Sequence, residues 1–455
     1  MDYNSENDDF DITLVEQEYL PPSLVFLTGV LFVGAGFLYT LVLLGVGTAH
    51  IPSHAVTYPY RAIFLGGCLV CIIAGIRFHL LEWRLKLLFP LVLFFTLYTT
   101  RVILDGFVNN IPLEESPYYY LAMSLGACFI PALAFLQRFP SKFYKFSFYF
   151  LVVVGFVLAI GISVVFSEWI GQARIKGKIT QIGFGPLHAG HFGAIFSVLG
   201  FYLLFMASRL RTFIIGGAMI LFGFPPFVLG ASRASLLSLV MGAILTYGSR
   251  IWKSTKIWPT VVLFLLLITG TLITYYSPFI DFTNVLLRRM PEFEGATIET
   301  TLDSRFGLWS NAWYQFTNSP LFGSGLVLEY SRSYPHNLFL EVFMATGILG
   351  GLSALIFFGV TIWSALKLLF FLPEAKQYAW LPLLFFHYLN YAMFSGALYV
   401  QTGLWCTAGA VLGLSAKIRF EQEQWFEEYE EYEEEEDEEE MEEDEEAFAE
   451  NPDFV

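Results

Sequence analysis

The chain has 455 residues, of which 56% are apolar, 18% aromatic and only 15% charged. Soluble domains carry about 25% charged residues, so this composition excludes most soluble enzyme folds. The formal net charge of −16 describes one segment only, because 21 of the 41 acidic residues lie in residues 421–453. The rest of the chain has 25 basic and 20 acidic side chains, a balance of +5.

The first 20 residues contain seven acidic side chains and neither lysine nor arginine. They lack the basic and apolar regions of a cleavable signal peptide. We therefore expect residues 1–22 to be a disordered, acidic, cytoplasmic N-terminus.

Apolar segments of membrane-spanning length recur from Leu24 onward. About 20 residues of helix cross a hydrocarbon core of roughly 30 Å. The sequence predicts an all-α membrane protein, a polytopic bundle of about twelve transmembrane helices. The predicted spans are 24–47, 56–76, 85–100, 118–136, 146–167, 187–206, 213–229, 234–248, 257–276, 347–372, 378–394 and 397–416.

The basic residues predict the orientation of these spans, since lysine and arginine beside a span resist translocation. A cytoplasmic N-terminus places fifteen of the 25 basic residues inside, with at least two in every inner connection. An even number of spans then makes both termini cytoplasmic. Arg61 and Arg101 stand at the outer ends of two spans. The remaining eight basic residues fall in three outer loops: Arg174, Lys176, Lys178, Arg233, Arg288, Arg289, Arg305 and Arg332.

These eight outer cations oppose the insertion bias, and their clustering in three loops on one side suggests one anion-binding site. The alternative is that they contact anionic lipid headgroups or pair with outer acids. The acids available for such pairs are Asp281, Glu292, Glu294, Glu299 and Asp303.

The longest connection is predicted to be a folded periplasmic loop, residues 277–346, between spans 1–9 (residues 23–276) and spans 10–12 (residues 347–416). Structureless loops of this length are uncommon. Within it, residues 304–317 carry aromatic side chains at three- and four-residue spacing, which predicts an amphipathic helix at the interface. Pro320 and the following glycines end that helix.

Residues 417–455 are predicted to be a disordered, acidic, cytoplasmic tail, because blocks of like charge repel and stay solvated. A basic cytoplasmic partner could bind there, but the sequence names none.

Few ionisable side chains lie inside the spans, which argues against an ion-coupled carrier. His191 and His387 lie within them, and His188 and Glu341 lie near the outer boundary. We interpret His387 as a packed polar residue. Motifs of soluble hydrolases, P-loop proteins and zinc proteases are absent. The pair Glu292 and Glu294 is weak evidence for a metal, so no metal or other cofactor is expected.

Arg233 and His336 are the candidate catalytic residues. Arg233 stands where the chain re-enters the membrane, at the start of a span, so the helix dipole and free N–H groups would reinforce its attraction for a phosphate. His336 stands at the outer boundary of another span, where an imidazole can transfer protons.

These residues occur in an ordered series of motifs over about 120 residues. With its twelve predicted spans, the chain resembles the O-antigen ligase and polymerase family of bacterial membrane glycosyltransferases. The matching features are Ser232-Arg233, the spacing of Arg305 and Trp309, the turn from Pro320 to Gly325, His336-Asn337, Glu341, and Gly347 with Gly350. Spans one to four resemble the family in architecture only.

The resemblance implies a GT-C-like bundle in the bacterial inner membrane and metal-independent, inverting glycosyl transfer. The donor would be an undecaprenyl-diphosphate-linked oligosaccharide at the outer face, and nucleic acid is not an expected partner. By this analogy Arg233 neutralises the leaving diphosphate and His336 activates the acceptor hydroxyl. Arg305, Asn337 and Glu341 are carried over as substrate-binding residues.

A second phosphate-binding cation is expected after the fifth span, and either Arg174 or Lys178 fits. The acceptor also stays open: a lipid A-core sugar for a ligase, a polyprenyl-linked glycan for a polymerase, or a protein hydroxyl. The alternative class of function is a multispan transporter or exporter of a small anion or a glycan lipid.

Overall fold

The computed structural model of this protein describes residues 20–48, 53–78, 80, 85–113, 115–166, 186–206, 209–230, 232–251, 298–331, 333–394 and 397–450. Within these ranges every regular element is helical, so the predicted all-α class is confirmed. The predicted span 257–276 lies outside them, as do Arg174, Lys178 and residues 1–19.

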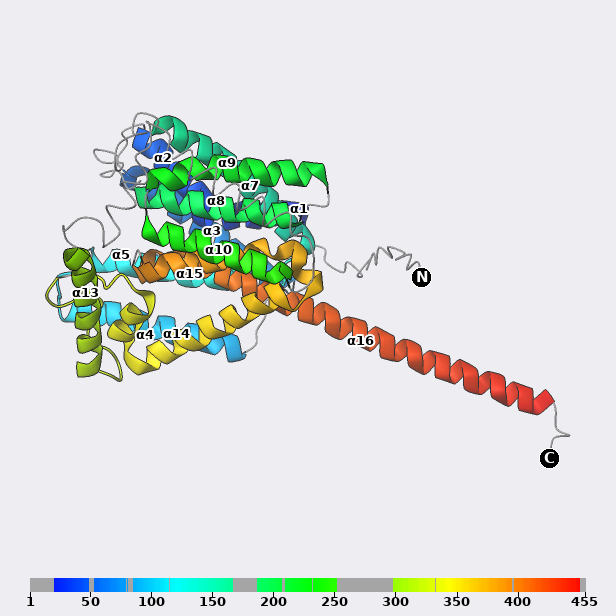
Figure 1. Ribbon diagram of the computed structural model, residues 1–455. Coiled ribbons are helices and arrows are strands. Elements are labelled where there is room, and N and C mark those ends of the chain that lie inside the picture. Colours follow the sequence, from blue (N-terminus) through cyan, green and yellow to red (C-terminus); the bar gives the residue numbers. More distant parts are fainter. Residues whose placement is uncertain are drawn as a thin grey trace.

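The first half of the chain forms seven segments that run back and forth through the molecule (Figure 1). Three of them contain π-helical turns: α1 continues through η1 into α2, α4 continues into η2, and α5 continues through η3 into α6. The bounds are α1 Pro22–Val33, η1 Gly34–Leu38, α2 Tyr39–Thr48, α3 Ser53–Arg77, α4 Leu85–Ile103, η2 Leu104–Val108, α5 Pro117–Leu121, η3 Ala122–Phe129, α6 Ile130–Phe135, α7 Ser141–Val165, α8 Pro186–Met206 and α9 Leu210–Gly230.

The second half adds the elements that carry the sequence motifs. The helix α13 lies at one end of the bundle, opposite the end from which α16 projects (Figure 1); we call its position the α13 end. The bounds are α10 Arg233–Ile251, α13 Ile298–Asn318, α14 Leu338–Phe370, η6 Pro373–Tyr378, α15 Trp380–Phe394, η7 Leu398–Val400 and α16 Thr402–Glu450.

Eight described helices are long and apolar enough to cross a membrane, and Ala234–Ser249 is a shorter apolar helix. They coincide with the predicted spans up to 213–229 and with 347–372. The predicted spans 378–394 and 397–416 correspond to α15 and the first part of α16. The described residues therefore indicate a membrane protein, while the predicted number of about twelve spans stays a prediction.

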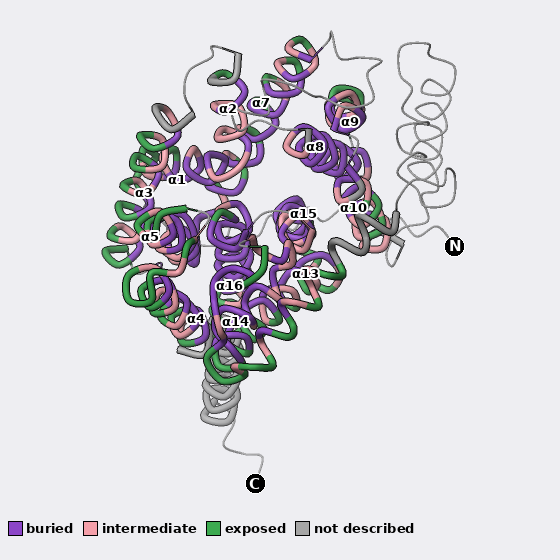
Figure 2. Tube along the Cα trace, turned by 90° about the vertical axis from the view of Figure 1, so that its left-hand side faces the viewer, coloured by how far each residue is buried: buried purple, intermediate pink, exposed green. Residues whose placement is uncertain are grey.

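The helix α16 begins as a central element and is buried on all sides over its first four turns (Figure 2). Trp405 and Cys406 are fully buried there, and Trp405 stacks on Phe94 of α4 with ring centroids 5.9 Å apart. Because this part of α16 is buried on every side, it packs inside the bundle and few of its side chains face lipid.

The acidic segment differs from the expected disordered tail, because α16 continues as one helix to Glu450. Glutamate is a strong helix former, and the packed first half of α16 removes the cost of nucleating a new helix. Lys417 and Glu421, one turn apart, form an ion pair where the helix leaves the bundle.

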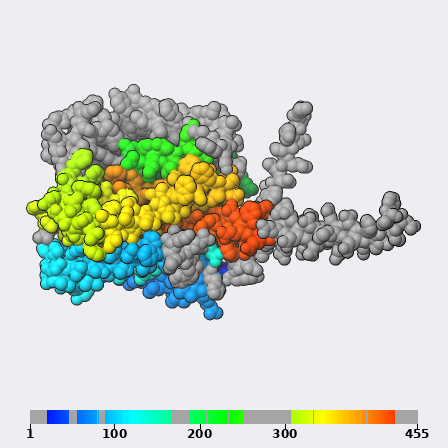
Figure 3. All heavy atoms as spheres, turned by 90° about the horizontal axis from the view of Figure 1, so that it is seen from below, coloured from blue at the N-terminus to red at the C-terminus, as the bar shows by residue number. Residues whose placement is uncertain are grey.

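The predicted boundary between loop and span at residue 347 falls inside α14. That helix begins nine residues earlier, at Leu338, and is broken at Gly347, which has φ 64° and ψ −160°. Residues 306–370 extend across one face of the molecule with α13 at one end, and α14 packs along α4 (Figure 3). The predicted amphipathic helix 304–317 lies within α13.

Candidate functional site

The residue His336 immediately precedes α14 and has an unusual backbone conformation. Its φ is 55°, and the only other described non-glycine residue with positive φ is Asn110. Holding such a residue in the left-handed region costs about 1–3 kcal/mol, and such strain clusters at functional sites. The imidazole is partly exposed and lies edge-on to Tyr334, with ring centroids 4.4 Å apart.

The residue Asn337 caps α14. Its side-chain oxygen accepts the backbone N–H of Leu340 at 3.2 Å, and its backbone carbonyl accepts the N–H of Glu341 at 2.9 Å. Asparagine is a preferred N-cap because it satisfies a backbone donor that the helix leaves open. Because α14 begins after this cap, His336 lies outside the helix, at its N-terminal end, which is the positive end of the helix dipole.

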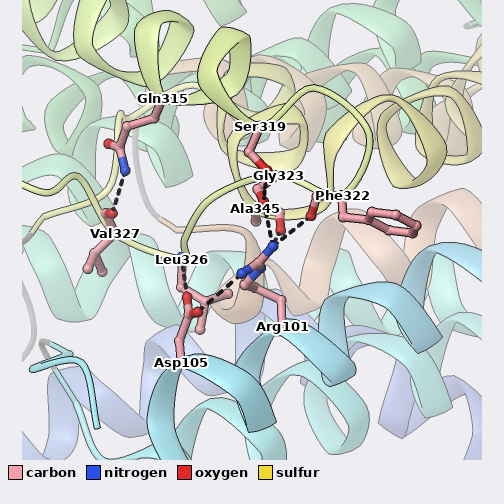
Figure 4. A network of polar contacts seen from close by, with 9 residues as sticks. All are labelled: Arg101, Asp105, Gln315, Ser319, Phe322, Gly323, Leu326, Val327 and Ala345. Atoms are coloured by element: carbon pink, nitrogen blue, oxygen red, sulfur yellow. Dashed lines mark hydrogen bonds and ion pairs between the residues drawn. The ribbon is translucent and has the colours of Figure 1, made fainter. Parts of the chain in front are cut away.

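A partly buried arginine, Arg101, and a buried aspartate, Asp105, contact the loop that precedes α14 (Figure 4). Arg101 donates to three backbone carbonyls: those of Ala345 at 3.0 Å, Phe322 at 2.8 Å and Gly323 at 2.5 Å. It also contacts Asp105, one turn further along, at 3.4 Å. Asp105 is 1% exposed and accepts the N–H of Leu326 at 2.9 Å.

These contacts hold the loop of residues 319–326 against the break in α14. Two glycines allow the loop backbone and the α14 backbone to approach each other closely. A Cβ atom on Gly347 would lie 2.4 Å from the carbonyl carbon of Leu321, and one on Gly323 would lie 2.5 Å from that of Ala345. Both have positive φ, which other residues rarely adopt. The glycines of the sequence motif are therefore explained by packing, and α13 is fixed relative to α14.

The side chain of Glu341 is committed to the backbone of another segment. It is 2% exposed, and its two oxygens lie 3.0 and 3.1 Å from the N–H of Leu398 in η7. The next residue, Tyr399, packs on Tyr120 with ring centroids 4.2 Å apart. Glu341 thus links the helix that follows His336 to η7, and this geometry favours a positioning role over the expected substrate contact.

We expect Glu341→Ala to lower the free energy of unfolding by about 1–3 kcal/mol, because it leaves a buried N–H without an acceptor. Thermal unfolding of the purified protein in detergent measures this. Glu341→Gln keeps an acceptor oxygen and should lose less. The matched control is the exposed Glu374, whose replacement by alanine should change stability by less than about 0.5 kcal/mol. Equal melting of Glu341→Ala and wild type would contradict the positioning role.

A polar cavity of about 510 Å³ lies between the helices at the α13 end. The side chains on one wall include His191 of α8 and His387 of α15, which are 5% and 4% exposed. Among the described residues, neither ring nitrogen of His191 has a hydrogen-bond partner, nor has Nδ1 of His387. Tyr391 packs on His191 with ring centroids 4.3 Å apart. The wall therefore offers polar atoms to an occupant or to water.

The start of α10 contacts α15, one of the helices that line this cavity. Asn390 of α15 donates to the carbonyl of Ala234 at 2.9 Å and to the Ser238 hydroxyl at 2.5 Å. Arg233 therefore begins a helix that packs against α15. The contact on α15 is made by Asn390, and the next residue of that helix, Tyr391, lines the cavity. Tyr334, the ring partner of His336, is within electrostatic range of Tyr391. Ala234, the residue after Arg233, is thus in contact with α15 one residue before the cavity-lining Tyr391.

The structure gives less detail on the other predicted site residues. Arg305 lies in α13, and the structure describes the backbone but not the side chain of Arg305 and of Arg233. Arg174 and Lys178 lie outside the described residues. Among the described residues, no group of three or more histidine, cysteine or acidic side chains could hold a metal ion.

Sequence reasoning missed the pair Arg101 and Asp105, and it interpreted Arg61 as only the outer end of a span. Opposite charges four residues apart within an apolar segment were a visible signal, but their partners lie more than 200 residues away. It also missed the pairing of His191 with His387, whose rings lie 5.4 Å apart.

The fold and site define a helical membrane protein with a polar cavity and a strained histidine at one end of the bundle. Residues 218–355 match the family model described as O-antigen ligase. This match confirms the resemblance to the O-antigen ligase and polymerase family. It spans Arg233, Arg305, His336, Asn337 and Glu341 but not Arg174 or Lys178. A search of curated proteins found no match.

Proposed function

We propose that this protein transfers a glycan from an undecaprenyl-diphosphate-linked donor to an acceptor hydroxyl at the outer face of the bacterial inner membrane. The observation that carries the proposal is the position of His336: it is strained, partly exposed and in ring contact with Tyr334, within the segment that matches O-antigen ligase. In this proposal the α13 end is periplasmic, and both termini are cytoplasmic.

The proposed reaction is one displacement at the anomeric carbon. The acceptor oxygen forms a bond to that carbon as the bond to the diphosphate breaks, which inverts the configuration. His336 takes the proton of the acceptor hydroxyl. Negative charge grows on the departing diphosphate, and Arg233 at the N-terminus of α10 stabilises it together with the helix dipole. Arg174 or Lys178 supplies a second cation, and Arg305 a further contact.

Two residues keep His336 in place in this mechanism without touching the reacting atoms. Asn337 caps α14, and Glu341 ties the same helix to η7. Positioning of this kind matters because a displacement of about 1 Å can lower a rate about 100-fold. The acceptor can be a lipid A-core sugar or a polyprenyl-linked glycan.

To test this proposal, surface glycan is measured on a strain that lacks this gene and is complemented with wild type or a variant at matched expression. We expect wild type to restore the glycan and His336 variants not to do so. Free core with accumulated long chains identifies a ligase, and core bearing one repeat identifies a polymerase. Full rescue by His336→Ala would contradict transfer chemistry and favour transport of a glycan lipid or an anion.

The role of Arg233 can be separated from a general effect of charge. Arg233→Ala should lower transfer about 100- to 1,000-fold, as loss of one preorganised donor does at comparable sites. Arg233→Lys keeps the charge but loses the planar fork of donors, so we expect a loss of about 10-fold. Quantified glycan per cell measures both. Replacing the exposed Arg209 by alanine is the control, and equal activity of Arg233→Lys and wild type would exclude a bidentate contact.

A further inference from the structure

A second arginine in the bundle, Arg61 of α3, is held without a carboxylate. It lies five residues into the candidate span Val56–Arg77, which is about 7.5 Å along a helix. Its two terminal nitrogens donate to the hydroxyls of Tyr119 and Tyr39, each at 2.9 Å. The guanidinium also lies over both rings, 5.5 Å from the centroid of Tyr39 and 5.7 Å from that of Tyr119.

Within the described part of the chain, the hydrogen bonds and ring contacts of Arg61 are therefore with neutral groups only. Among the described residues, no acidic side chain forms an ion pair with it, and the exposed Glu115 lines the neighbouring cavity without contacting it. A guanidinium has five N–H donors, and the two phenols accept two of them. Charged side chains inside a membrane protein are costly and usually functional, so the remaining donors point to an anion.

Two cavities meet at this arginine. One is the polar cavity of the candidate site; the other, of about 470 Å³, lies between η1, α2, α3, α5 and η3. Arg61, Tyr39 and Tyr119 line both. Away from them, the second cavity has mostly apolar walls: Gly34, Ala35, Ala62, Phe64, Leu65, Ala122, Met123, Gly126 and Ala127. Its two sides thus suit a molecule with an anionic head and an apolar chain.

The helices α3 and α5, which line the apolar cavity, lie at the edge of the bundle (Figure 2). Tyr58 and Tyr118, which line it, are 57% and 73% exposed, and Ile63 on the adjacent face of α3 is 74% exposed. Tyrosines gather at the depth of lipid headgroups. The π-helical turns η1 and η3 both border this cavity, and such turns often occur at functional sites.

We propose that Arg61, with Tyr39 and Tyr119, binds the phosphate of a membrane lipid whose apolar chain occupies the cavity between α3 and η3. The ligand class is a phosphate- or diphosphate-bearing lipid. Each phenol hydroxyl accepts a hydrogen bond from Arg61 and can donate a hydrogen bond to a phosphate oxygen. The guanidinium supplies the positive charge that attracts the phosphate. The proposal stands independently of the transfer reaction, because binding needs no turnover.

Binding to the full-length protein in detergent, measured by native mass spectrometry, tests this. The probes are undecaprenyl diphosphate, phosphatidic acid and, as a neutral lipid, diacylglycerol. We expect Arg61→Ala to weaken binding of at least one phosphorylated probe about 10-fold or more. Arg77→Ala, an exposed arginine at the other end of α3, is the matched control and should bind like wild type.

The probes also separate the two sources of the phosphate. Weaker binding of undecaprenyl diphosphate alone would identify the donor lipid, and weaker binding of phosphatidic acid as well would identify a general phospholipid site. Unchanged binding of both by Arg61→Ala, or an equal loss in Arg77→Ala, would overturn the proposal.

A second variant reaches the site without touching the arginine. Gly126→Leu fills the apolar cavity from η3, where a Cβ would already lie 3.3 Å from Leu65. It should weaken binding of long-chain phosphorylated lipids about 5-fold or more and leave that of short-chain phosphatidic acid nearly unchanged. If Arg61→Ala does not fold, Arg61→Gln is used instead in the same assay. Glutamine removes the charge and keeps two N–H donors. Unimpaired long-chain binding by a folded Gly126→Leu would contradict the placement of the chain.

Discussion

His336→Ala is expected to lower glycan transfer about 100- to 10,000-fold, the range that one positioned general base contributes. The reason is that removal of the imidazole leaves the acceptor hydroxyl protonated during attack. Transfer by the purified protein, or glycan per cell at matched expression, measures the loss. The variant should remain folded, because the side chain is partly exposed and outside the helix.

The strained backbone at His336 requires a control that separates conformation from chemistry. His336→Gly adopts a positive φ without strain, so it keeps the entry into α14 and removes only the imidazole. We expect it to melt at or above the temperature of wild type and to be as inactive as His336→Ala. Tyr330→Ala, at an 80% exposed position of the same loop, should transfer normally. Activity in His336→Gly would mean that the residue serves the backbone turn.

Arg101→Leu is expected to produce the largest loss of stability, about 3–5 kcal/mol, because it strips the buried Asp105 of its counter-charge. It also leaves the carbonyls of Phe322, Gly323 and Ala345 without this donor. Thermal unfolding in detergent measures the effect. We further expect faster proteolysis within residues 319–326, since the loop is no longer fastened to α4.

A double-mutant cycle distinguishes the buried pair from two independent contacts. If Arg101 and Asp105 act together, Arg101→Leu combined with Asp105→Leu should destabilise the protein less than the sum of the two single changes. The exposed Arg77 on α3 is the control for loss of one positive charge. Additive losses, or a melting temperature unchanged by Arg101→Leu, would mean that the pair does not hold the loop.

The arginine network explains how a loop far from α4 in sequence contributes to the position of His336. Arg101 ties residues 322–323 to α14 at Ala345, and Glu341 ties the first turns of the same helix to η7. The segment from Leu338 to the break at Gly347 is therefore held from two sides. The side chain of Glu341 is 2% exposed and that of Arg101 is 13% exposed, so both contacts are largely shielded from solvent.

Local patterns in the chain were sufficient for several features of this protein. Apolar segments of about 20 residues predicted the helical membrane class, and the aromatic spacing around Trp309 predicted the helix that became α13. The order of Arg233, Arg305 and His336 indicated the O-antigen ligase family, which the match to residues 218–355 confirmed. These signals are short-range periodicities and motif spacings, which a single sequence displays directly.

Other features depended on contacts between distant parts of the chain and were decided by the tertiary structure. Glu341 appears in sequence as a substrate ligand, yet it accepts the N–H of Leu398, 57 residues away. Arg61 appears as the end of a span, yet Tyr39 and Tyr119 place it between two cavities. Composition and periodicity determined which segments are helical. The packing of those helices decided which ionisable side chains are structural and which are available to a ligand, because desolvation and hydrogen-bond partners exist only in the folded bundle.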